Sequence, residues 1–66
     1  MGGVTTAELA AHIAAILDGD WDDGLNAYVE AAAETRASGV SGLRVSLKSD
    51  GGDEIGLFRI IVKSIA

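Results

Sequence analysis

The segment Glu54-Ile-Gly-Leu-Phe-Arg-Ile-Ile-Val-Lys-Ser-Ile-Ala66 decides the fold, because it holds most of the large apolar residues of the second half of the chain. Its β-branched residues favour an extended strand, which we expect at about residues 54–65. Both alternating faces of this strand are largely apolar. One face carries Phe58, Ile60 and Val62, and the other carries Leu57, Ile61 and Ile65. A strand with two apolar faces needs cover on both of them.

The segment just before it predicts a partner strand at about residues 42–48. Apolar and polar residues alternate strictly from Leu43 to Lys48, which is the pattern of a half-buried strand. The glycine-containing turn at residues 49–53 then joins the two strands into an antiparallel β-hairpin.

Two registers of this hairpin compete. A Gly51-Gly52 loop sets Arg44 opposite Arg59, and a Gly52-Asp53 loop sets Leu47 opposite Phe58. Like charges that face each other across a sheet are destabilising, whereas an apolar pair contributes about 0.2–1 kcal/mol. We therefore predict the second register.

Upstream, the sequence predicts two helices at about residues 5–18 and 20–38. Thr5 followed by Glu8 forms a capping box at the start of the first helix, and Gly19 suits its end. Asp20 is placed to cap the second helix, which repeats apolar residues at helical spacing. That apolar face comprises Trp21, Leu25, Tyr28, Val29 and Ala32.

These elements predict one small α+β domain over residues 1–66, in the order α-α-β-β, after a flexible leader at residues 1–4. A helical hairpin packs on one face of an antiparallel β-hairpin. Because two helices cover only one face, we expect dimerisation to extend or cover the sheet.

Composition supports self-association. A chain of 66 residues buries only about 60% of its unfolded surface. Domains this small usually need disulfides, metals or oligomerisation. The chain has no cysteine and one histidine, which excludes a disulfide, a thiolate metal site and a histidine-based zinc site. We expect no cofactor, and the lack of cysteine favours a cytoplasmic location.

Charge is distributed unevenly along the chain, which has a formal net charge of −5. Residues 1–42 carry seven acids against Arg36, a net charge of −6, and residues 43–66 carry four bases against three acids, a net charge of +1. The acidic part repels phosphate, so nucleic acid is not the expected partner.

The predicted binding surface is the sheet face turned away from the helices. It combines apolar residues with cations, and we expect it to bind a second copy or another protein. The predicted interface residues are Arg44, Lys48, Leu57, Arg59, Ile61, Lys63 and Ile65.

Three other functions have weaker sequence support. Glu30, Glu34, Asp22 and Asp23 on the second predicted helix form an acidic row that would imitate a nucleic-acid backbone. Residues 18–24 space acids as a calcium loop does, but lack the glycine and the final glutamate at the required positions. An enzyme is not expected, because His12 has no nucleophile or orienting group marked by a motif.

Overall fold

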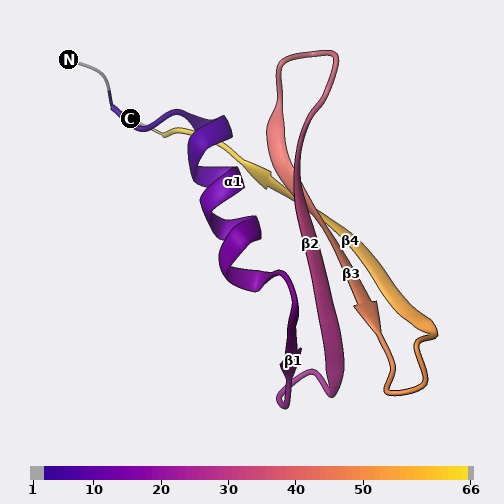
Figure 1. The fold of residues 1–66 in the computed structure, drawn as a ribbon. Helices are drawn as coiled ribbons and strands as arrows, with labels where there is room; N and C mark the ends of the chain where they lie inside the picture. The colour runs from indigo at the N-terminus through magenta and orange to yellow at the C-terminus, as the bar shows by residue number, and fades with distance from the viewer. Residues whose placement is uncertain (1–2, 66) are drawn as a thin grey trace.

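A computed structural model describes residues 3–65 as one helix followed by a four-stranded antiparallel sheet (Figure 1). The elements are α1 (Thr6–Leu17), β1 (Asp20–Asp22), β2 (Ala27–Thr35), β3 (Ser41–Lys48) and β4 (Glu54–Val62). The strands lie in the order β1-β2-β3-β4, so each pairs with the next along the chain. The predicted α+β class is confirmed. The leader predicted at residues 1–4 includes Met1 and Gly2, which lie outside the described residues.

Helix α1 begins at the predicted capping box. The backbone N–H of Glu8 donates to Thr5 Oγ1 over 3.0 Å, and the backbone N–H of Thr5 donates to Glu8 Oε1 over 3.0 Å. The bonds from Thr5, first its backbone N–H and then its hydroxyl, hold the pKa of the Glu8 carboxyl below its ordinary value. The first predicted helix is therefore confirmed at its N-terminus.

The second predicted helix, at residues 20–38, is wrong, because this segment forms β1, a turn, β2 and the first residues of the next connection. Asn26 has a φ of 51°, in the left-handed region, and helps the chain reverse between β1 and β2. The segment after it also alternates, since Ala27 and Val29 are buried while Tyr28 and Glu30 are exposed. Alanines satisfy both a helical and an alternating pattern, so helix propensity misled the prediction.

The predicted register of the β3–β4 hairpin is also wrong by two residues. Arg44 lies opposite Arg59, and Leu47 lies opposite Gly56. The like-charge pair is tolerated because Glu34 of β2 accepts a hydrogen bond from Arg59. Since the shift is an even number of residues, the two faces of β4 are those predicted.

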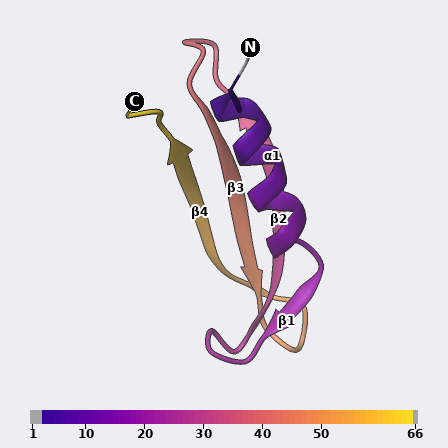
Figure 2. The ribbon, with the colours of Figure 1, turned by 90° about the vertical axis from the view of Figure 1, so that its left-hand side faces the viewer.

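The core lies between α1 and the two central strands. Ala10 and Ala14 of α1 are buried, and Leu43 and Val45 of β3 are buried beneath the helix. Small residues on the helix allow this close approach. Figure 2 shows α1 over β2 and β3, while β4 stands beside them with little helical cover. None of the described helices is long and apolar enough to span a membrane.

Candidate interaction surface

Strand β4 forms an open edge of the sheet. Antiparallel strands alternate residues that bond to one neighbour with residues that bond to the other. The Arg36 N–H donates to the Val40 carbonyl at the end of the β2–β3 ladder. Since residues bond alternately to one neighbour and the other, the even-numbered residues of β3 bond to β2 and the odd-numbered residues bond to β4. Phe58 and Ile60 lie opposite Val45 and Leu43, so their backbone groups turn toward β3. The N–H and C=O groups of Leu57, Arg59 and Ile61 therefore point to the open edge.

The opposite edge of the sheet is protected. Strand β1 pairs with the first residues of β2. Beyond it, Gly19 N–H donates to the Val29 carbonyl over 2.8 Å, and Ala31 N–H donates to Asp18 Oδ1 over 2.8 Å. Local groups thus occupy bonding positions on β2 that a foreign strand would need. No such partner occurs on the outer side of β4 among residues 3–65, so the two edges differ in their readiness to pair.

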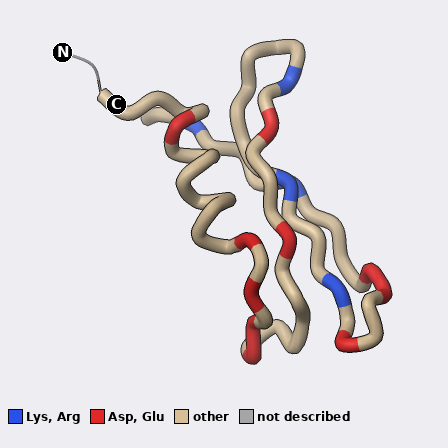
Figure 3. The backbone as a smooth tube through the Cα atoms, in the orientation of Figure 1, with Lys and Arg blue, Asp and Glu red and all other residues tan. Residues whose placement is uncertain are grey.

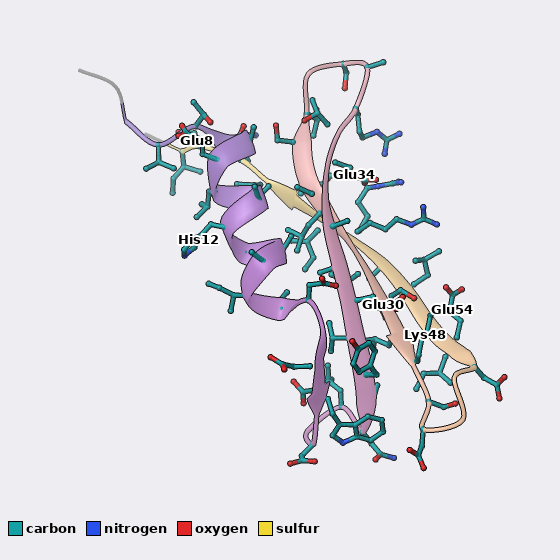
Figure 4. The ribbon with its side chains drawn as sticks, in the orientation of Figure 1. Glu8, His12, Glu30, Glu34, Lys48 and Glu54 are labelled. Carbon is teal, nitrogen blue, oxygen red and sulfur yellow. The ribbon has the colours of Figure 1, made fainter. Side chains whose placement is uncertain are left out.

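The sheet face away from α1 carries a balanced set of charges (Figure 4). Glu30 Oε1 lies 3.2 Å from Lys48 Nζ, and Glu34 pairs with Arg59. Ser46 Oγ donates to Glu54 Oε1 over 3.1 Å. Within strands β2, β3 and β4, three acids and three bases occupy this face, namely Glu30, Glu34, Glu54, Arg44, Lys48 and Arg59. The face is therefore close to neutral and offers no basic surface for phosphate.

The structure places five predicted interface residues together on this face: Arg44, Lys48, Leu57, Arg59 and Ile61. Lys63 and Ile65 lie beyond the end of β4, and Ile65 is almost fully exposed. The sequence interpretation missed Glu30 and Glu34 as members of this face, because it placed both on a helix. Their positions follow only from strand pairing, since their partners Lys48 and Arg59 are 18 and 25 residues away in the sequence.

An apolar groove lies on the other side of β4, next to α1. Its volume is about 480 Å³. Its walls are mostly the side chains of Leu17, Leu25, Val29, Val45, Leu47, Phe58 and Ile60, with Asp22 and Arg59 at its border. Phe58 and Ile60 were predicted to lie beneath helices, but they are 54% and 43% exposed. Their exposure follows from the missing second helix, and we call this site the α1–β4 groove.

The remaining candidate residues occupy separate positions. His12 lies on the outer side of α1 (Figure 4). Asp18 accepts a backbone hydrogen bond from Ala31, and Asp22 Oδ1 accepts one from Leu25 over 2.9 Å. Within residues 3–65, no three histidine, cysteine or acidic side chains form a group suited to a metal. The acids proposed for a calcium loop lie in and around β1.

Comparison with protein-family models, with curated proteins and with solved structures finds no match to this chain.

Proposed function

We propose that the chain is a small protein-binding module that homodimerises through the free edge of β4 and binds another protein. The observation that carries this proposal is the nine-residue open edge of β4, which is flanked by exposed apolar residues on both faces. Those residues are Ile55, Leu57, Phe58, Ile60 and Ile61. An exposed, apolar edge strand is a template for pairing with another strand.

The outward residues of β4 suit an antiparallel pair of two β4 strands. A two-fold axis at Phe58 sets Phe58 opposite its copy and Leu57 opposite Arg59 of the other chain. This register pairs two aromatic rings and keeps the Arg59 side chains apart, both of which favour cross-strand pairing. An axis at Arg59 would bring like charges together. The Phe58 axis also lets the whole of Glu54–Val62 take part.

The difference between the two sheet edges predicts a dimer rather than a fibre. Two-fold pairing uses the β4 edge of both chains, and each chain then presents only its β1–β2 edge to solvent. That edge is short at β1 and occupied at β2 by Asp18 and Gly19. Closed symmetry of this kind uses the longer open edge of both chains within the dimer, and of the described strands leaves to solvent only the edge of β1 and the last residues of β2, beyond Ala31.

The dimer is expected to dissociate on dilution. Full burial of a leucine or isoleucine side chain contributes about 1.5–3 kcal/mol, and the β4 side chains are already half-buried. Loss of translational and rotational freedom opposes association by about 4–15 kcal/mol. The balance predicts reversible self-association.

Light scattering over micromolar to millimolar concentration tests this proposal, using the unmutated chain and two variants of Ile61. Ile61→Asp places an unpaired carboxylate in an apolar interface. Ile61→Pro removes one outward N–H without removing a bond to β3. Both variants are expected to be folded monomers at concentrations where the unmutated chain is a dimer.

Ile16→Asp is the matched control, because Ile16 is an isoleucine that lies on α1 and is 63% exposed, against 49% for Ile61. This variant is expected to dimerise like the unmutated chain. A monomeric unmutated chain at every concentration would refute the dimer, and dimers of both Ile61 variants would refute the role of the β4 edge.

The acidic-mimic alternative receives no support from the geometry. Glu30 and Glu34 form ion pairs with Lys48 and Arg59 on one face of the sheet. Asp22 lies opposite Ala27, a residue of the other face. The four acids therefore do not form one row, and mimicry of a regular phosphate backbone needs such a row.

A further inference from the structure

We infer that the α1–β4 groove binds an amphipathic helix of a partner protein, with basic residues at the end that lies beside the β1–β2 turn. This inference deepens the partner binding of the proposed function by naming the site and the chemistry of the partner. It does not require the β4-edge dimer, because every residue of the groove belongs to one chain.

The size of the uncovered region fits one helix. Strands are about 4.8 Å apart, so β4 lies about 7 Å from the line beneath α1, which covers β2 and β3. Packed helices lie about 8–10 Å apart. A helix beside α1 would therefore lie along β4 and cover Phe58 and Ile60. A two-layer domain normally covers the apolar face of its sheet in this way.

Both walls of the groove are apolar. On the sheet side are Phe58 and Ile60. On the helix side the groove is lined by Leu17. Leu9, near the other end of α1, borders a separate cavity together with Val62 and Lys63, so its flank of α1 also faces β4. Ile16 is two helical turns further on, lies on the same flank and is 63% exposed. Thus α1 presents apolar side chains toward the empty space as well as toward the sheet, as a helix does when it has a helical neighbour.

The outer side of α1 explains why a second copy of α1 is not the occupant. Glu8 and His12 lie one turn apart on that side (Figure 4). If two chains packed with their helices between their sheets, these polar side chains would be buried against the second sheet, which is costly without hydrogen-bond partners. A separate amphipathic helix keeps its own polar side in water and avoids this cost.

Acidic residues at one end of the groove indicate the charge that the partner helix should carry. Asp20 and Asp22 lie opposite Val29 and Ala27, so their side chains point to the helix side of the sheet. Asp23 follows in the turn, and these acids gather at one end of the structure (Figure 3). Among residues 3–65 none of the three forms an ion pair. Basic residues on the docked helix would complement this end of the groove and raise the association rate.

The test uses two synthetic helical peptides with the same leucine face. One carries lysines at one end, and the other carries glutamates at those positions. Binding is measured by isothermal titration calorimetry, and the contact surface is mapped by backbone amide chemical shifts. Each peptide is titrated into the unmutated chain and into the Ile61→Pro variant, which is expected to be a monomer. Failure of the dimer and failure of the groove then give different results.

The lysine peptide is expected to bind both proteins, to shift the amides of Leu17, Leu25 and Phe58, and to bind more tightly than the glutamate peptide. In the protein, Leu25→Ser is expected to weaken binding about tenfold, as loss of a buried leucine side chain does. Val40→Ser changes a partly exposed apolar residue in the connection between β2 and β3 that does not line the groove, so it is the matched control and is expected to bind normally.

Three results would overturn the inference. The first is no saturable binding of either peptide up to millimolar concentration. The second is equal affinity of the two peptides. The third is a set of shifted amides confined to Leu57, Arg59 and Ile61, which would show that the peptide pairs as a strand with the β4 edge.

Discussion

Strands β3 and β4 are neighbours with similar apolar residues, yet only β3 is buried. Leu43 of β3 is fully buried, whereas Ile60, which lies directly opposite it on β4, is 43% exposed. The two side chains share one face of the sheet, and the difference is their position relative to α1. Burial here is set by which strands the helix covers. Strand β4 keeps apolar side chains without cover, and this is why we propose that it is the binding strand.

Truncating Leu43 and Ile60, which lie opposite each other, is expected to produce the largest difference in the free energy of unfolding. Leu43→Ala creates a cavity in the core, and such changes cost about 2–5 kcal/mol, a large part of the stability of a small domain. Ile60→Ala removes a half-exposed side chain and is expected to cost about 1 kcal/mol. Urea unfolding at low protein concentration measures both. Equal losses would contradict the distinction between the covered and the uncovered strand.

A smaller effect on stability is expected at the N-terminus of α1, the helix that covers β2 and β3. Thr5→Ala removes the acceptor for the Glu8 N–H and is expected to cost about 1 kcal/mol. Because the folded state lowers the pKa of Glu8, the stabilisation by its carboxylate is present above the pKa of the unfolded chain. It is lost as the pH falls through the lower pKa of the folded chain.

Urea unfolding as a function of pH measures this contribution. Glu8→Gln is expected to flatten the acid part of the profile. Thr5→Ala is expected to flatten it only in part, because the backbone N–H of residue 5, the larger cause of the lowered pKa of Glu8, is still present. An unchanged profile in both variants would show that the capping box does not stabilise α1.

The sequence predicts those elements whose signals are local. The capping box at Thr5 and Glu8 marks the start of α1, and the strict alternation from Leu43 to Lys48 marks β3. The two apolar faces of β4 were also predicted correctly, even with the wrong register, because faces depend only on parity.

Non-local interactions decide what the sequence interpretation missed. The alanines of β2 fit a helix or a strand, and only the cover of α1 and the pairing with β3 select the strand. The register that sets Arg44 opposite Arg59 was rejected for its like charges. The ion pair between Arg59 and Glu34 offsets this repulsion, but Glu34 lies on β2, a strand that was not predicted. The α1–β4 groove was missed for the same reason, since it exists because one helix is absent.

Hydrogen exchange of the backbone amides of β4 tests the central claim most directly. In the unmutated chain, the amides of Phe58, Ile60 and Val62 turn toward β3 and are expected to be protected at every concentration. The amides of Leu57, Arg59 and Ile61 turn outward. We expect them to be protected at millimolar concentration and to lose that protection on dilution, because pairing of two β4 strands closes the edge only in the dimer. Fast exchange of Leu57, Arg59 and Ile61 at all concentrations would contradict pairing through the β4 edge.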